Sequence, residues 1–266
     1  MRALYAVYGW RALGIRWDYA RLKLAAALTE RRAPGAKITT RVAGWRVTAF
    51  GYGAFSAHFG SKFIDLEYWF ATDVPRPFII DCGANIGTAT LFFKTLFPAA
   101  EIVAFEPDPR AFEALRVNVR DNHLANVAIQ QAAVGGADGR ATLYVGPAVP
   151  GTGQASLYAP TERVGTTEVD VVRVSRFIDR QVDLLKIDIE GAEMDVLREL
   201  AETGKLALVR QMVIEYHHHM RPEEDRMSEL FRLLENAGFG YVVRVPHPTP
   251  YRPRVYQDIL VYAYRG

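Results

Sequence analysis

The stretch FIIDCGANIGTATLFF, residues Phe78–Phe93, is typical of a buried strand, a tight glycine turn and a helix in succession. A dinucleotide loop needs closely spaced glycines that bring backbone N–H groups to a pyrophosphate, whereas here three residues separate Gly83 from Gly87. Asp81 adds a carboxylate, which would repel a pyrophosphate and attract an ammonium group. S-adenosylmethionine carries an amino-acid tail and no phosphate, so the loop favours that ligand.

An acidic residue also follows the next predicted strand, EIVAFEP, and it lies roughly 20 residues beyond the glycine loop. A carboxylate at this place accepts hydrogen bonds from both ribose hydroxyls of an adenosine. Glu106 therefore predicts an adenosine ligand, although NAD and S-adenosylmethionine share this signal. An NAD-dependent oxidoreductase is the alternative from another enzyme class, and the glycine spacing and Asp81 weigh against it.

Strands and helices alternate from Phe78 onward, which predicts an α/β fold with a parallel sheet and helices on both of its faces. The third strand is expected over residues 127–134, so that it ends in Ala133 and Val134. The last two strands, at 241–245 and 257–264, favour an antiparallel closing hairpin. We place this domain over residues 75–266.

Residues 1–74 form a predicted N-terminal extension with a helix over 1–32, a hairpin over 37–50 and a helix over 55–70. The first helix is basic and aromatic. We expect it to pack on the domain, and contact with a membrane surface, with an acceptor or with a second copy in a homodimer are left open. Pro75 and Pro77 end this region before the first core strand.

The composition is that of a globular protein, with 266 residues, 23% charged residues and a net charge of +2. This small net charge does not indicate a basic surface that binds nucleic acid. The single cysteine, Cys82, excludes an intrachain disulfide and fits a reducing compartment. Apolar runs are too short for a membrane span, so we expect a soluble, cytoplasmic protein without stable membrane insertion.

Charged residues follow the two strands that should end beside the ligand, in KIDIEGAE and VIEYHHH. Lys186 and Asp188 share one face of their strand, because side chains alternate along a strand. Charges on a doubly covered strand are costly unless they are paired or used. We therefore expect Asp188, Glu190, Glu215 and His217 to converge, with Lys186 beside them.

Three interpretations of this acidic group stay open at the level of sequence. In one, His217 or a carboxylate is the general base that takes the acceptor's proton. In another, Asp188, Glu215 and His217 bind Mg²⁺ or Mn²⁺, which polarises an acceptor hydroxyl. In the third, the group is a salt-bridge network in which Lys186 offsets the acids. Glu193 is expected to cap the following helix as readily as to act in the site.

The segments FIIDCGANIGTATLFF, VAFEPDPRAFEALRVNVRDN, DLLKIDIEGAEMDVLREL and MVIEYH together resemble the FkbM family of S-adenosylmethionine-dependent methyltransferases. The resemblance runs from about Lys37 to Tyr264. It implies the class I methyltransferase fold, a Rossmann-like seven-stranded sheet whose last strand is antiparallel. It also implies methyl transfer, most often O-methylation of sugars or natural products, onto a small-molecule acceptor. N- or carboxyl-methylation and a non-catalytic S-adenosylmethionine-binding module remain alternatives.

Carried over position by position, the resemblance assigns cofactor contacts to residues of this chain, and it leaves Tyr68 between a role at the methionine end of the cofactor and packing. The expected cofactor contacts are Glu67, Asp81, Gly83, Ala84, Asn85, Gly87, Thr88, Glu106, Pro107, Ala133, Val134 and Asp188. The expected catalytic residues are Lys186, Asp188, Glu190, Glu215 and His217. The expected acceptor contacts are His217 and Ser156, which lies in a polar loop over residues 151–158 that we expect to act as a lid or to contact the acceptor.

Overall fold

The computed structural model describes residues 2–29, 35–145, 155–158, 165–218, 220, 227–245 and 257–265. Its centre is a seven-stranded sheet in the order β12-β13-β11-β10-β3-β4-β5. In chain order the strands are β3 Phe78–Cys82, β4 Glu101–Phe105, β5 Val127–Gln130, β10 Leu184–Ile187, β11 Gln211–His218, β12 Gly240–Arg244 and β13 Gln257–Tyr264. All pairs from β5 to β11 are parallel, and β13 is antiparallel to both of its neighbours. The expected sheet with an antiparallel last strand is therefore confirmed.

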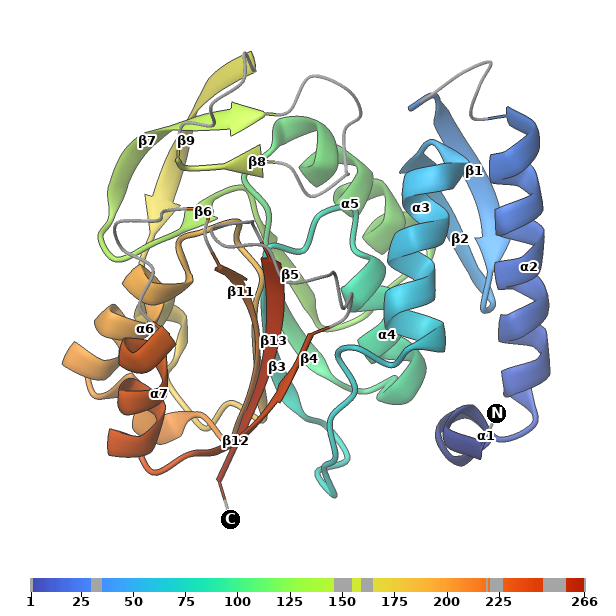
Figure 1. Cartoon of the computed structure of the whole chain (residues 1–266). Coiled ribbons are helices and arrows are strands. Elements are labelled where there is room, and N and C mark those ends of the chain that lie inside the picture. The colour runs from blue at the N-terminus through green and yellow to red at the C-terminus, as the bar shows by residue number, and fades with distance from the viewer. Residues whose placement is uncertain are drawn as a thin grey trace.

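Helices cover both faces of the sheet (Figure 1). On one face lie α4 Thr88–Leu96 and α5 Pro109–Asp121, and on the other lie α6 Glu193–Glu202 and α7 Met227–Asn236. Because both faces are covered, β3 is buried along its whole length and reads as one continuous apolar run interrupted only by Asp81. Parallel strands with covered faces bring all their carboxyl ends to one edge, where a ligand binds in this architecture.

A smaller sheet of four strands lies beyond β5, in the order β6-β9-β7-β8. Its strands are β6 Ala133–Val134, β7 Gly139–Val145, β8 Ala155–Ser156 and β9 Gly165–Val172. The predicted third strand over 127–134 is wrong in this respect, because β5 ends at Gln130 and Ala133 pairs with Val171 of β9. An apolar run shows that a segment is extended, and it does not show which sheet the segment joins.

The N-terminal extension packs beside α4 and α5, and Figure 1 shows it as a separate blue layer. It contains α1 Arg2–Tyr8, α2 Arg11–Thr29, the hairpin β1 Lys37–Val42 with β2 Trp45–Phe50, α3 Tyr52–Phe59 and the π-helical turn η1 Gly60–Ile64. The hairpin occurs where it was predicted. The single first helix is broken at Gly9, whose φ of 57° is left-handed.

The helix expected over 55–70 is also shorter than predicted, because it begins at Tyr52 and passes into η1, which ends at Ile64. Tyr68, which lies shortly after this π-helical turn, is buried. None of the helices in the described ranges is long and apolar enough to cross a membrane.

Candidate functional site

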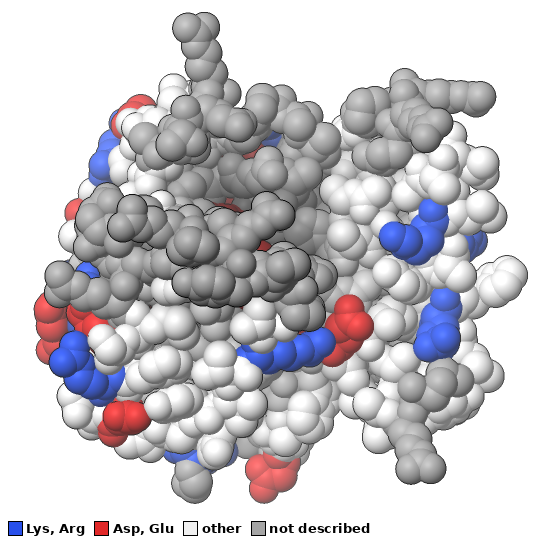
Figure 2. Space-filling model, in the orientation of Figure 1, with Lys and Arg blue, Asp and Glu red and all other residues white. Residues whose placement is uncertain are grey.

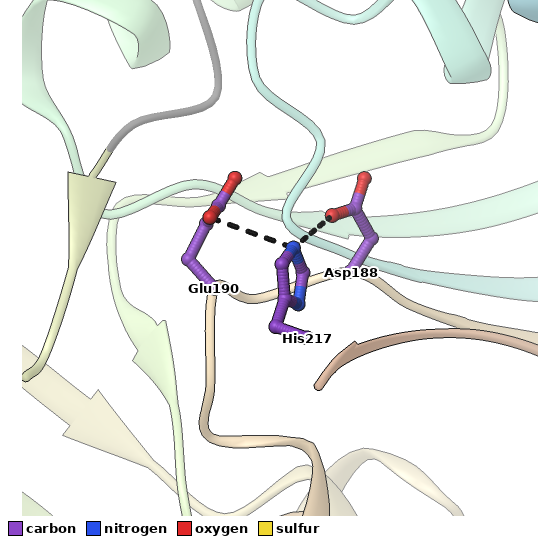
Figure 3. A group of neighbouring side chains, drawn as sticks. All are labelled: Asp188, Glu190 and His217. Carbon is purple, nitrogen blue, oxygen red and sulfur yellow. Dashed lines mark ion pairs between the residues drawn. The ribbon is translucent and has the colours of Figure 1, made fainter. Parts of the chain in front are cut away.

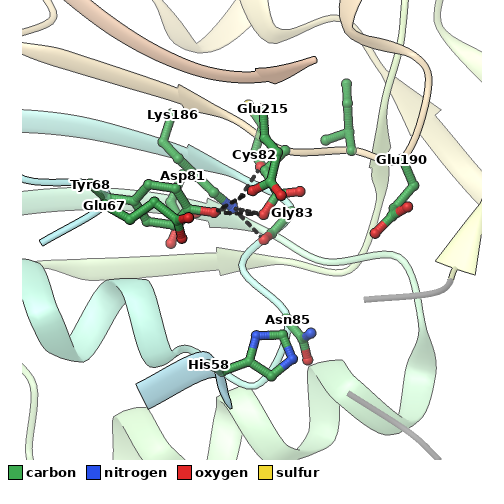
Figure 4. Close-up of polar contacts among 12 residues, drawn as sticks. His58, Glu67, Tyr68, Asp81, Cys82, Gly83, Asn85, Lys186, Glu190 and Glu215 are labelled. Atoms are coloured by element: carbon green, nitrogen blue, oxygen red, sulfur yellow. Dashed lines mark hydrogen bonds and ion pairs between the residues drawn. The ribbon is translucent and has the colours of Figure 1, made fainter. Parts of the chain in front are cut away.

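The glycine loop links β3 to α4 at the carboxyl edge of the sheet. Gly83 and Gly87 both have left-handed backbones, with φ of 82° and 88°, and Asn85 between them has φ of 52°. The imidazole of His58 from α3 lies beside the Asn85 side chain (Figure 4). A Cβ at Gly83 would lie 1.8 Å from the backbone oxygen of Asp188, so this loop and the end of β10 are in direct contact.

Substituting Gly83 by alanine is expected to destabilise the fold by more than about 2 kcal/mol, because a left-handed backbone and a backbone clash act together. Gly44 is the matched control, since its φ is 88° and nothing lies within 4 Å of its added Cβ. Gly44→Ala should cost only about 1 kcal/mol. Urea denaturation of both variants measures the difference. Equal losses would show that the contact with Asp188 carries no energy.

Glu106 lies just beyond β4, and its carboxylate is buried beside the loop. One carboxylate oxygen accepts the backbone N–H of Asn85 at 2.7 Å and the other accepts that of Asp108 at 2.8 Å. Burial raises the pKa of Glu106 to about 7, although these two donors act in the opposite direction. Each oxygen keeps a second lone pair, so the chemistry of this carboxylate fits two hydroxyl donors such as those of a ribose.

Asp81 lies in β3 and is completely buried. Its Oδ1 lies 3.2 Å from the Lys186 ammonium, and its Oδ2 accepts the Thr90 hydroxyl at 3.1 Å. Lys186 also donates to the backbone oxygens of Cys82 and Gly83. The ligand ammonium that the sequence assigned to Asp81 would share this carboxylate with Lys186, and that role stays a prediction.

Tyr68 reaches the edge of the sheet from the N-terminal extension (Figure 4), and Lys62 lies beside its ring. The Tyr68 hydroxyl lies 2.8 Å from Asp188 Oδ2 and 3.1 Å from Glu215 Oε2, so it bridges the two carboxylates. Lys62 Nζ lies 2.9 Å from Glu67 and 4.4 Å from the centre of the Tyr68 ring. Glu67, an expected cofactor contact, is thus held in an ion pair beside the acidic group.

His217 lies near the end of β11 and is surrounded by carboxylates (Figure 3). Its Nδ1 is 2.7 Å from Glu193 Oε1, and its Nε2 is 3.5 Å from Glu190 Oε2 and 3.9 Å from Asp188 Oδ1. Glu193 is nearly inaccessible, and the same Oε1 accepts the backbone N–H of Gly191 at 2.9 Å. Glu193 therefore binds the backbone just before α6 and also orients the imidazole of His217.

The protonation states of this group follow from burial and crowding. Burial alone would lower the pKa of His217, but Glu193, Glu190 and Asp188 together raise it well above its usual range. Burial, together with the neighbouring Asp188, raises the pKa of Glu190 and of Glu215 to about 8. Burial would also raise the pKa of Asp188, yet Lys186 and His217 hold it below its usual range.

The geometry allows two kinds of chemistry. The imidazole of His217, with Nδ1 held by Glu193, can exchange a proton at Nε2. Asp188, Glu190 and His217 can also each offer one ligand atom to a cation, since these atoms lie within 4.8 Å of one another. The predicted metal set of Asp188, Glu215 and His217 differs from both groups found in the described residues, because Glu215 is grouped with His217 and Asp258.

The other predicted site residues lie around this edge. Ser156 donates its hydroxyl to the backbone oxygen of Glu190 at 2.6 Å, so β8 reaches the acidic group. Ala133 and Val134 are buried in β6, whereas Ala84 and Thr88 are buried in and just after the loop, and Pro107 is partly exposed beside Glu106. The remainder of the predicted acceptor loop, residues 151–154, lies outside the described residues.

Sequence reasoning did not assign Lys62 to the site, and it left Tyr68 between a ligand role and packing. A signal is present in hindsight, because Lys62 is a buried ammonium in the apolar segment HFGSKFIDLEYWF and needs a buried acid. The sequence alone does not show that the acid is Glu67, or that Tyr68 joins Asp188 to Glu215.

The strand order, the antiparallel β13, the glycine loop after β3 and the acid after β4 define a class I methyltransferase. The model of the FkbM methyltransferase domain matches residues 81–241, and the chain belongs to this family of S-adenosylmethionine-dependent methyltransferases. Methyltransferase 1 of Beauveria bassiana is 31% identical over 220 residues, which cover 74% of this chain and 86% of that protein.

Two further relatives have more specific names. The 31-O-demethyl-FK506 methyltransferase FkbM of Streptomyces tacrolimicus is 29% identical over 63% of this chain and 74% of its own length. The 2-O-methyltransferase NoeI of Sinorhizobium fredii is 28% identical over 53% of this chain and 64% of its own length. Both names describe transfer to an oxygen atom of those proteins' substrates.

Proposed function

We propose that this protein methylates a hydroxyl group on a sugar or another small natural product. The observation that carries the proposal is the buried pair of His217 and Glu193, which presents Nε2 of the imidazole at the carboxyl edge of the sheet. A hydroxyl is a weak nucleophile at neutral pH, so its methylation gains from a positioned base. The names of the relatives that act on oxygen support the same class of acceptor.

S-adenosylmethionine, when bound, supplies a methyl group on a positively charged sulfur. Glu106 would hold the ribose hydroxyls through the lone pairs that its two backbone donors leave. Glu193 keeps the proton of His217 on Nδ1, so that Nε2 receives the proton of the acceptor hydroxyl. Tyr68 fixes Asp188 and Glu215 beside this imidazole, and the buried carboxylates stabilise positive charge at this edge.

A divalent cation is the second candidate for activating the hydroxyl, because Asp188, Glu190 and His217 lie within ligand distance of one another. The Lys186 ammonium, at 3.4 Å from Asp188 Oδ2, would repel such an ion. We therefore favour the base. Full turnover after thorough chelation supports it, whereas loss of turnover that added Mg²⁺ or Mn²⁺ restores would establish the cation.

The proposed activity is tested by transfer of labelled methyl groups from S-adenosylmethionine to a panel of acceptors. The panel contains matched small molecules with a hydroxyl, an amine or a carboxyl group, including methyl glycosides. Turnover of hydroxyl acceptors alone is the expected result. Turnover confined to amines or carboxylates would replace the proposal by N- or carboxyl-methylation.

Replacing Glu106 by glutamine is expected to weaken S-adenosylhomocysteine binding by about 10- to 100-fold, because hydrogen bonds to a charged group are lost. The amide also turns a donor toward one of the two backbone N–H groups. Glu113→Gln, at an exposed position of α5, is the matched control and should bind normally. Calorimetric titration with S-adenosylhomocysteine and with NAD measures both affinities, and tighter binding of NAD would favour an oxidoreductase.

A further inference from the structure

Helix α2 has two apolar faces, and only one of them packs on the protein. Ala12, Ile15 and Leu22 are buried against the extension. Tyr19 extends this inner face, because its ring stacks on Phe59 with centroids 6.5 Å apart and closes over Gly60. The helix is therefore fixed in place, and its orientation is set by these contacts.

The opposite face of α2 exposes large apolar side chains. Leu13 is 58% exposed, Trp17 73%, Leu24 62% and Leu28 65%. With 3.6 residues per turn, these four residues fall on one narrow stripe along the helix. Trp10, at 82% exposure in the turn before α2, extends the stripe. We call these five residues the outer face of α2. Single exposed apolar residues need no explanation, but an aligned set that includes two tryptophans does.

Basic residues flank the outer face of α2. Arg16 and Lys23 are exposed along one side of it, and the Arg11 guanidinium lies 5.9 Å from the centre of the Trp10 ring. The one acidic residue of α2, Asp18, is turned the other way, because its Oδ2 accepts the backbone N–H of Ala43 at 2.8 Å. On the face shown in Figure 2, the right-hand part over α2 and its hairpin shows Lys and Arg without Asp or Glu. The stripe is therefore apolar, with positive charge along one side and at its N-terminal end.

We propose that the outer face of α2 docks on the surface of an anionic lipid bilayer. Tryptophan and leucine side chains enter the boundary between headgroups and acyl chains, while arginine and lysine extend to the lipid phosphates. The helix lies in the plane of the surface, since no helix of the described ranges can cross a membrane. A second copy is a poorer occupant, because an antiparallel two-fold contact would bring the two positively charged sides together.

Vesicle co-sedimentation of the full chain tests the proposal. We expect binding to vesicles of phosphatidylcholine in which about a third of the lipid is phosphatidylserine, and at least tenfold weaker binding to phosphatidylcholine alone. Raised salt should release the protein, because it screens the contribution of the basic residues. Equal binding to both vesicles, or no binding to either, would overturn the proposal.

Paired variants distinguish the outer face of α2 from the rest of the surface. Trp17→Ser with Leu24→Ser should weaken binding by more than tenfold. The control is Val242→Ser with Val243→Ser, which removes exposed apolar groups from β12 and should have no effect.

Charge is tested in the same way. Arg16→Gln with Lys23→Gln should weaken binding more than tenfold, since each basic residue near an anionic surface contributes about fivefold. Arg140→Gln, at an exposed position of β7, is the control.

Sedimentation velocity tests whether a second copy of the chain covers the outer face of α2 instead. Lipid docking would be refuted if the unchanged protein formed a dimer and did not bind vesicles, and if Trp17→Ser with Leu24→Ser converted that dimer to a monomer. The outer face of α2 would then be assigned to contact with a second copy.

Discussion

Replacing His217 by alanine is expected to lower kcat by about 10²- to 10⁴-fold, which is the usual contribution of a general base. Binding of S-adenosylhomocysteine should change by less than about tenfold, because the adenosine contacts proposed for Glu106 lie elsewhere at the sheet edge. Single-turnover methyl transfer with a hydroxyl acceptor measures the first quantity, and calorimetry measures the second. His123→Ala, at an exposed position after α5, is the matched control.

The pH profile tests the same base independently. A base works only when it is deprotonated, and the surrounding carboxylates raise the pKa of His217 well above its usual range. Glu190 and Glu215, with pKa values of about 8, lose their protons in the same region. The rate kcat/KM should therefore rise with pH from pH 6 to pH 9, because His217 loses its proton only above the usual histidine range. A rate that is constant from pH 6 to pH 9 would contradict a base in this group.

Glu193→Gln separates a positioning role from a merely structural one. Removing this carboxylate takes away the strongest charge that raises the pKa of His217, so the rising limb of the profile should shift to lower pH. The plateau rate should also fall, because a neutral amide accepts a weaker hydrogen bond from Nδ1–H than a carboxylate does. A fall in rate without any shift of the limb would show that Glu193 acts only at the start of α6.

The local chemistry of the chain was enough to predict the central architecture. The signals that predicted it are short-range and depend on neighbouring residues. They are the glycines in the loop after β3, the proline at the start of α5 and the alternation of strands with helices. The alternation of Lys186 and Asp188 along one strand also predicted that both face the same side. The ion pair of Lys186 with Asp81 joins neighbouring strands of the sheet, and the local patterns in a sequence do not specify such a partner.

Partners from distant segments account for most of what sequence did not predict. Residues 127–134 divide between two sheets because Ala133 pairs with a strand some 40 residues later, and pairing is decided by tertiary packing. Tyr68 belongs to the acidic group because its hydroxyl bonds Asp188 and Glu215, which lie 120 and 147 positions away in the chain. Sequence alone favours a helix start and the site equally for Glu193, and in the structure its carboxylate contacts both the Gly191 backbone N–H before α6 and the His217 imidazole.

Lys186→Met is expected to destabilise the fold by about 3–5 kcal/mol, the cost of leaving buried carboxylates without their cation. Lys186 is 1% exposed, and its ammonium lies 3.2 Å from Asp81 Oδ1 and 3.4 Å from Asp188 Oδ2. Methionine keeps a similar length and volume, so the substitution removes the charge with little change in packing. Urea denaturation followed by circular dichroism measures the loss.

The double variant Asp81→Asn with Lys186→Met tests whether that loss is electrostatic. Neutralising Asp81 removes the carboxylate closest to the missing ammonium, so about half of the lost stability should return, or soluble expression should return if the single variant does not fold. Asp188 accepts a hydrogen bond from the Tyr68 hydroxyl and is partly accessible to solvent. We therefore expect its charge to tolerate the loss of the Lys186 ammonium better than the charge of Asp81 does. No recovery in the double variant would mean that Lys186 acts through its bonds to the Cys82 and Gly83 carbonyls, which hold the glycine loop against β10.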